Sequence, residues 1–259
     1  MRIAMGVEYD GSRYAGWQTQ RHAPSVQAAV EAAVAKVANH PVAVTCAGRT
    51  DAGVHALGQI IHFDTVAQRS PHGWRLGVTS NLPDSIAIPW AMPVREDFDA
   101  RFSATARSYR YVILNRPVRP GVLHGRVSWT WKPLNAASMQ QAAQFLVGEH
   151  DFTSFRAVQC QARHARREVR DIAVHAQGDF LYLDVTANAF LHHMVRNIAG
   201  TLMAVGSGDR PVGWVRDVLQ ARDRTAGGIT APAAGLYFVA AHYPERFNLP
   251  PRPEPPCFG

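Results

Sequence analysis

Segments with the periodicity of strands and segments with the periodicity of helices alternate along the whole chain, in a comparable order in its two halves. In the first half the pattern predicts strands at 2–9, 42–47, 59–63 and 86–94, and helices at 26–38 and 71–81. In the second half it predicts strands at 106–114, 168–175, 180–187 and 236–242, and helices at 135–147, at about 190–205 and after Pro211. This order predicts an α/β (α+β) protein made of two similar mixed layers packed side by side.

The same pattern predicts where the parts of the chain begin and end. We expect an N-terminal half at 1–104, a C-terminal half at 105–244 and a proline-rich tail at 245–259. The tail contains the sequence PPRPEPPCFG, which is typical of an extended or disordered segment, and little function is expected there.

Composition narrows the class of protein. A chain of 259 residues that is 47% hydrophobic can bury a sizeable core. It shows no signal-peptide pattern and no run of eighteen apolar residues, so a soluble, cytoplasmic protein without a membrane partner is expected. Cys46, Cys160 and Cys257 form no CxxC pair, which predicts neither a disulfide framework nor a structural zinc site.

The basic residues favour a polyanionic partner, because clustered cations release counter-ions from phosphates. The formal net charge is +7, and of the 27 basic residues only Lys36 and Lys132 are lysines, which leaves 25 arginines. Arginine binds phosphates bidentately and stacks on bases, as RNA sites require. A G+C-rich genome also favours arginine codons, and both explanations stay open at this point.

The stretch CAGRTDAGVHALGQ contains one carboxylate, Asp51, between Gly48 and Gly53. The glycines let a ligand approach closely, and Arg49 would share a face with Asp51 if the preceding strand continued, favouring the ionised carboxylate. An ionised carboxylate can act as a nucleophile or a base. The alternative is an aspartate that bonds its own backbone in an Asx-turn.

Two further clusters carry aromatic and basic residues. In RFSATARSYRYVILNR, 101–116, Tyr109 and Tyr111 share one strand face and Arg110 lies on the other, which is typical of a nucleic-acid surface or, alternatively, of core tyrosines with solvated arginines. In NAFLHHMVRNIAGTLMAVGSG, 188–208, Arg196 interrupts an apolar helix and needs a carboxylate, for which Asp51 is the preferred candidate.

Some chemistries lack support. His192 and His193 are adjacent and could not both face one metal from a helix, so we expect packing histidines and no metal site. Leu236 in APAAGLYF is a possible apolar wall of a site. The chain has no GxxxxGK[ST], GxGxxG or GxSxG motif, so nucleotide hydrolysis, hydride transfer and esterase chemistry are not indicated.

Six blocks in this order resemble the tRNA pseudouridine synthase A family, known as TruA: YDGSRYAGWQTQ, AGRTDAGVHALGQ, FDARFSATARSYRY, HDFTSF, NAFLHHMVRNIAG and AGLYF. Only the tail after about Pro244 matches nothing expected of the family. The resemblance implies the pseudouridine synthase fold, with two halves of mainly antiparallel sheet around a central RNA-binding cleft.

The resemblance also implies a function. The protein would isomerise uridine to pseudouridine at positions 38, 39 and 40 of the tRNA anticodon arm, as a homodimer and with no cofactor or metal. Asp51 would be the catalytic residue, Tyr109 would stack on the target base and Arg196 would pair with Asp51. Leu236 would line the pocket, and Arg49 would help to displace the base from the stem.

Alternatives remain at this point. Asp51 could attack the sugar, attack the base or remove a ribose proton. A second hypothesis is an RNA-binding protein without chemistry, and a third is a glycoside hydrolase, which would need a second carboxylate facing Asp51. Glu8, Asp10 and Asp64 are close to it in sequence only.

Overall fold

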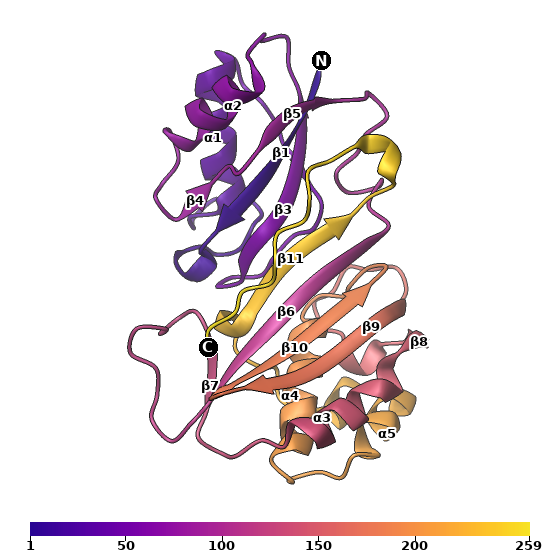
Figure 1. Cartoon of the computed structure of the whole chain (residues 1–259). Coiled ribbons are helices and arrows are strands. Elements are labelled where there is room, and N and C mark those ends of the chain that lie inside the picture. The colour runs from indigo at the N-terminus through magenta and orange to yellow at the C-terminus, as the bar shows by residue number, and fades with distance from the viewer. The chain divides into compact units, whose positions relative to one another are not determined.

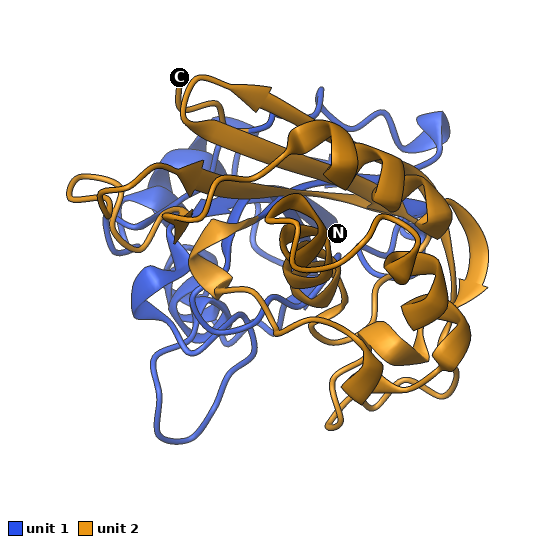
Figure 2. Ribbon diagram, turned by 90° about the horizontal axis from the view of Figure 1, so that it is seen from below, with its two compact units in different colours: residues 1–106, 237–255 blue, residues 107–236, 256–259 orange.

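A computed structural model describes all 259 residues, which divide into two compact units. Unit 1 consists of residues 1–106 and 237–255, and unit 2 of residues 107–236 and 256–259 (Figure 2). The units differ from the predicted halves at the C-terminal end, where residues 237–255 group with unit 1. The reason is that strand β11 (Leu236–His242) pairs with β3 (His55–Asp64) in a parallel register that sets Tyr237 opposite His55.

The sheet of unit 1 is built on two long antiparallel strands, β1 (Arg2–Tyr9) and β3, with Met5 opposite Ile61. Residues 3–7 of β1 are all buried, because the strand lies inside the sheet and is covered on its faces. The strand order is β4-β1-β3-β11, and the shorter strands are β2 (Thr45–Cys46) beside β3, and β4 (Ile86–Ala87) and β5 (Ala91–Val94) beside β1.

Two helices of unit 1, α1 (Val26–Ala38) and α2 (Pro71–Thr79), lie next to each other beside this sheet (Figure 1). Each begins where a serine side chain accepts a hydrogen bond from the first turn, Ser25 from the Ala28 N–H at 3.3 Å and Ser70 from the Gly73 N–H at 3.0 Å. The ring of Phe63 on β3 meets the α2 ring Trp74 edge-on at 5.4 Å, which joins helix and sheet in one core.

The sheet of unit 2 has the order β6-β10-β9-β8, and all neighbours in it are antiparallel. Leu183 of the central strand lies opposite Tyr111 on one side and Val174 on the other, so the middle of the sheet is apolar. The strands are β6 (Ala106–Asn115), β7 (Ser128–Thr130), which runs parallel to β6, β8 (Gly148–Asp151), β9 (Arg166–Gln177) and β10 (Phe180–Ala187).

Three helices of unit 2 gather beside this sheet: α3 (Ala136–Ala143), α4 (Met194–Gly206) and α5 (Trp214–Ala221) (Figure 1). Helix α4 is the most buried, with Ile198 and Leu202 completely inaccessible. It begins at Met194 and not near residue 190 as predicted, because His193 has a φ of 61° and interrupts helical geometry. None of the helices is long and apolar enough to cross a membrane.

Strands β1, β10 and β11 have the predicted bounds, and α1 follows its predicted cap. The predicted strand at 86–94 is wrong in part, since it breaks into β4 and β5 around Pro89, which has no N–H to donate. The predicted strand at 42–47 is reduced to two residues, and the helix at 135–147 ends as a 3₁₀ turn, Gln144–Leu146. The short strands β7 and β8 were not predicted.

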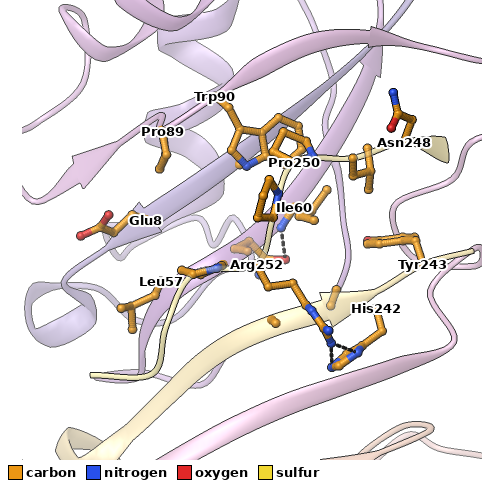
Figure 3. Close-up of a pocket in the computed structure, with 18 of the residues that line it drawn as sticks. Glu8, Leu57, Ile60, Pro89, Trp90, His242, Tyr243, Asn248, Pro250 and Arg252 are labelled. Carbon is orange, nitrogen blue, oxygen red and sulfur yellow. Dashed lines mark hydrogen bonds between the residues drawn. The ribbon is translucent and has the colours of Figure 1, made fainter. Parts of the chain in front are cut away.

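The proline-rich tail has no regular secondary structure over residues 250–259, as its composition predicts, but it makes specific contacts. In unit 1, Arg252 bonds the ring of His242 (Figure 3). In unit 2 the Tyr182 hydroxyl accepts the Phe258 N–H at 2.8 Å, and Arg110 donates to the Pro256 carbonyl at 3.0 Å. The tail is therefore part of both units and not a separate segment.

Candidate active-site loop

Asp51 lies in the loop between β2 and β3, and its side chain is half-buried. The loop leaves the sheet just after Ala47, whose N–H still donates to the Ile60 carbonyl at 2.8 Å. The buried Gln59 side chain then holds Gly48 on both sides: its Oε1 accepts the Gly48 N–H at 3.3 Å and its Nε2 donates to the Gly48 carbonyl at 2.5 Å. The approach to Asp51 is thus held by one backbone hydrogen bond and by two hydrogen bonds with the Gln59 side chain.

The first sequence block, YDGSRYAGWQTQ, holds the loop from a second direction. The hydroxyls of Tyr9 and Thr50 are 2.7 Å apart, and the Trp17 N–H donates to the Thr50 carbonyl at 3.0 Å. Beyond Asp51, the Gly53 N–H donates to the carbonyl of Tyr14 at 3.3 Å. The residues on both sides of Asp51 are therefore bonded to the same segment, which explains why the two blocks occur together.

Two glycines are required by this packing. Gly16 has a φ of +102°, and a Cβ on it would lie 2.7 Å from the Thr50 carbonyl oxygen. Gly53 has a φ of 76° in the turn where the Val54 N–H donates to the Asp51 carbonyl at 3.2 Å. Both backbone conformations favour glycine, so close backbone approach shapes the loop around Asp51.

Arg49 is exposed and forms no ion pair. Strand β2 ends at Cys46, so the condition under which Arg49 and Asp51 would share a strand face is not met. Cys46 itself is buried, and burial raises the pKa of its thiol to about 11, against the opposing effect of the Arg49 charge. The Cys46 thiol therefore stays protonated near neutral pH and cannot supply a thiolate nucleophile.

The acidic residues that a hydrolase would use are engaged elsewhere in unit 1. Asp64 receives two hydrogen bonds from Arg2, at 2.9 and 2.8 Å, and this guanidinium lowers the pKa of the carboxyl. Asp10 accepts the Ser12 N–H at 2.9 Å and begins a 3₁₀ turn. Glu8 lines a separate cavity. None of the three is shown as a second catalytic carboxylate for Asp51.

That cavity has a volume of about 750 Å³ and lies in unit 1 under the tail, where Trp90, Pro250 and Arg252 line it (Figure 3). It is the larger of the two described cavities, yet it holds none of the predicted site residues. The Asp51 loop is the better candidate, because its backbone is held from two directions and it presents a titratable side chain.

In unit 2, Tyr109 and Arg110 contact different residues, as expected for opposite faces of β6. Tyr109 is 9% exposed, and its ring meets that of Phe190 edge-on at 4.9 Å. Arg110 donates two hydrogen bonds of 2.7 Å to Asp184 and lies over the ring of Tyr182. Arg110 is thus held by a carboxylate of the neighbouring strand, while Phe190 fixes the Tyr109 ring.

Arg196 occupies the first turn of α4 and is half-buried. Its Nε donates to the Ala231 carbonyl at 2.9 Å, and the Ala231 N–H donates back to the Arg196 carbonyl at 3.1 Å. Leu236, which is 5% exposed, follows shortly after this loop. The orientation of Arg196 therefore depends on the segment that runs up to Ala231.

The next residue, Asn197, holds that segment, and sequence reasoning assigned it no role. Its side chain is buried, donates to the Phe155 carbonyl at 2.8 Å and accepts from Thr230 at 2.7 Å and from Arg224 at 3.1 Å. The sequence signal that could have identified Asn197 is a polar residue on the buried side of an apolar helix. Asn197 is therefore a candidate positioning residue for Arg196.

His192 and His193 lie before α4 and not on it, with ring centroids 4.0 Å apart. The argument from helical spacing against a shared metal therefore does not apply to them. Arg49 and Asp51 belong to unit 1, whereas Tyr109, Arg196 and Leu236 belong to unit 2. The pairing of Asp51 with Arg196 remains a prediction.

Comparison with known proteins identifies a family. The chain matches the model described as tRNA pseudouridine synthase over residues 5–103 and 142–244. It is 55% identical over 258 residues to tRNA pseudouridine synthase A of Tolumonas auensis, with 100% of this chain and 99% of that protein covered. The protein of the same name from Hydrogenovibrio crunogenus is 56% identical over 248 residues, with 96% and 95% covered.

The crystal structure of a Cbf5-Nop10-Gar1 complex aligns with 91% of this chain and 48% of that chain, at 12% identity and a TM-score of 0.38, which is too low to add to the comparison. The family model ends at residue 244, but the alignment with the Tolumonas protein extends over 258 residues. The tail thus lies outside the family model and inside the alignment with the Tolumonas protein.

Proposed function

The chain belongs to the tRNA pseudouridine synthase family, and we propose that it isomerises uridine to pseudouridine in the anticodon stem-loop of tRNA, at positions 38, 39 and 40. One structural observation carries the assignment of the catalytic group. Asp51 follows Thr50, whose hydroxyl and carbonyl are both bonded to the first sequence block, and precedes the turn at Gly53. A carboxylate held in this way is prepared for one geometry of attack or proton transfer.

The reaction places limited demands on the protein. The N1 glycosidic bond breaks, the uracil turns, C5 joins the ribose, the C5 hydrogen leaves as a proton and N1 takes up a proton, so no atom is added overall and no electron is gained. A group donor or redox cofactor is therefore not required. Asp51 would act by attacking the sugar, by attacking the base or by removing a ribose proton, and all three fit a half-buried carboxylate on a held loop.

The other residues would prepare the base for Asp51. A base in a stem must be flipped out, which costs a few kcal/mol of unstacking. Tyr109, whose ring is oriented by Phe190, would stack on the flipped base, and the exposed Arg49 would fill the gap it leaves. Arg196 would pair with Asp51, oriented by its bond to Ala231. Leu236 would form the apolar wall.

The proposal includes a homodimer that acts in the cytoplasm, with a central cleft that takes the anticodon arm. The net charge of +7 supports a polyanionic substrate. Equilibrium sedimentation tests the dimer: we expect twice the chain mass at micromolar concentration. A monomer mass would remove the dimer from the proposal without affecting the assignment of Asp51.

The decisive experiment uses unmodified tRNA that carries tritium at uracil C5. Wild-type protein should release tritium to water, because forming the bond from C5 to the ribose expels that hydrogen. Asp51→Asn should release none and still bind tRNA. Absence of release by wild type, despite tight binding, would leave an RNA-binding protein without chemistry. Loss of tRNA binding together with activity in Asp51→Asn would make Asp51 structural.

A further inference from the structure

The loop that connects the 3₁₀ turn Thr153–Phe155 to strand β9 concentrates positive charge. This basic loop, defined as residues 156–167 (RAVQCQARHARR) and so including the first two residues of β9, contains four arginines and one histidine and no Asp or Glu. The side chains of Arg163, His164 and Arg166 are exposed, and those of Arg156 and Arg167 are half-buried. A segment of this length with cations and no acids favours an anionic partner.

Three of the four arginines have no carboxylate partner. Arg156 donates to the carbonyls of Cys160 and Ala162, and Arg167 donates to the carbonyls of His164 and Arg166. Arg166 differs, because its guanidinium lies 3.4 Å from a carboxylate oxygen of Glu149. The carbonyl groups that Arg156 and Arg167 contact are neutral, so they orient these guanidinium groups without neutralising the positive charge. Arg156, Arg163 and Arg167 form no ion pair.

Arg167 has a buried hydrogen-bond donor that the loop does not satisfy. Its Nε is buried and has no hydrogen-bond partner. Burial lowers the pKa of its guanidinium, the Cys160 sulfur opposes this effect, and the positive charge of Arg156 adds to it. A half-buried guanidinium whose Nε has no partner carries a desolvation cost that a bound anion would offset. The arrangement indicates a site for a strong anion.

The basic loop is attached to the residues that precede α4. The Ala157 N–H donates to the His192 carbonyl at 3.0 Å, and the sulfur of Cys160 accepts the His192 N–H at 3.5 Å. One residue before the loop, the Phe155 carbonyl accepts from Asn197 on α4 at 2.8 Å. The unpaired arginines therefore lie on a loop that is bonded to the end of the helix that carries Arg196.

We propose that Arg156, Arg163 and Arg167 bind backbone phosphates of the RNA substrate beside the N-terminal end of α4. The planar guanidinium group forms two parallel bonds to a phosphodiester, which suits a loop that presents several of them. The phosphate contacts would set the register of the RNA relative to Arg196, while carrying no sequence information. This inference rests on the proposed function, since the RNA is the substrate named there.

The salt dependence of tRNA binding tests the proposal. The dissociation constant of unmodified tRNA is measured over a series of KCl concentrations for wild type, Arg163→Ala and the double variant Arg163→Ala/Arg167→Ala. Each lost phosphate contact should reduce the slope of the logarithm of the dissociation constant against the logarithm of the KCl concentration by about one. Arg170→Ala is the matched control, because Arg170 is exposed on β9 and already lies 3.3 Å from Glu168. It should keep the wild-type slope.

Arg163 is exposed and makes no hydrogen bond to its loop, so Arg163→Ala keeps the test valid even if the double variant does not fold. A wild-type slope and dissociation constant for Arg163→Ala and for a folded double variant would overturn the phosphate site. Tritium release by wild type is measured separately. If the variants have reduced slopes but wild type releases no tritium, the phosphate site is supported and the isomerase activity is rejected. If wild type releases tritium but the variants keep the wild-type slope, the isomerase activity is supported and the phosphate site is rejected.

Discussion

The hydroxyl of Tyr9 lies 2.7 Å from the hydroxyl of Thr50, the residue before Asp51, and both side chains are buried. The two residues are 41 positions apart in the chain, so only the folded sheet brings them together. Removing the Tyr9 hydroxyl takes away the partner of the buried Thr50 hydroxyl, which costs about 1 to 3 kcal/mol. The stability of unit 1 and the position of Asp51 are thus linked through one contact.

Tyr9→Phe should therefore lower both stability and turnover. We expect the free energy of unfolding to fall by about 1 to 3 kcal/mol and the turnover number to fall by up to about 100-fold, with a smaller change in tRNA affinity. Tyr14→Phe is the control, since it removes a tyrosine hydroxyl 2.8 Å from Ser85, in the same block but away from Thr50. Urea unfolding measures the stability of both variants, and tritium release measures their turnover. Equal losses of turnover in the two variants would contradict the link between the Tyr9–Thr50 contact and Asp51.

Gly16→Ala should disturb the Asp51 loop by crowding. The new Cβ would lie 2.7 Å from the Thr50 carbonyl oxygen, in a backbone conformation with a φ of +102°. We expect a loss of stability on the order of 1 to 3 kcal/mol and a marked loss of activity.

Gly178→Ala separates the two causes of this effect. Gly178 also has a positive φ, +55°, but a Cβ there would meet nothing within 4 Å. It should lose some stability and keep full activity in the tritium assay. If Gly178→Ala reduced turnover as much as Gly16→Ala does, crowding at Thr50 would not be the cause.

Turnover should depend on the shape of the Arg196 side chain as well as on its positive charge. Arg196→Lys keeps a cation but loses the Nε that donates to Ala231 at 2.9 Å, so both Arg196→Lys and Arg196→Ala should lose about 100-fold or more in turnover. Arg216→Ala on α5, whose side chain is 56% exposed, is the control and should keep its activity. An active and equally stable Arg196→Ala would rule out the pairing with Asp51.

Stability should depend on pH through His62. Burial lowers the pKa of its imidazole below the ordinary 6.5, and its Nδ1 accepts the Ala100 N–H at 3.0 Å, a bond that protonation breaks. Below pH 6.5 the unfolded chain binds this proton more readily than the folded one, so stability is present above that pH and is lost as pH falls through the folded pKa.

The variant His62→Gln tests this dependence by urea unfolding between pH 7.5 and 5. The decline of the unfolding free energy on acidification should become shallower than in wild type. His72→Gln, on the exposed side of α2, should keep the wild-type decline. A His62→Gln curve parallel to that of wild type would show that other groups cause the decline.

Sequence alone determined the elements whose signals are local. Strand β10 and helix α1 follow from side-chain periodicity and from the cap at Ser25, which act within a few residues. The blocks around Asp51 and Arg196 also identified the family, because such combinations of residues are seldom met by accident. These signals need no knowledge of which distant segments meet.

Tertiary structure decided what depends on distant partners. Gln59 and Tyr9 hold the loop of Asp51, and Asn197 holds the segment that orients Arg196, through hydrogen bonds between residues far apart in the chain. The end of β2 at Cys46 likewise follows from where pairing with β3 stops. Hydrogen bonds and packing form only when the chain brings their partners together, so periodicity predicts the elements and the fold decides how the side chains between them are held.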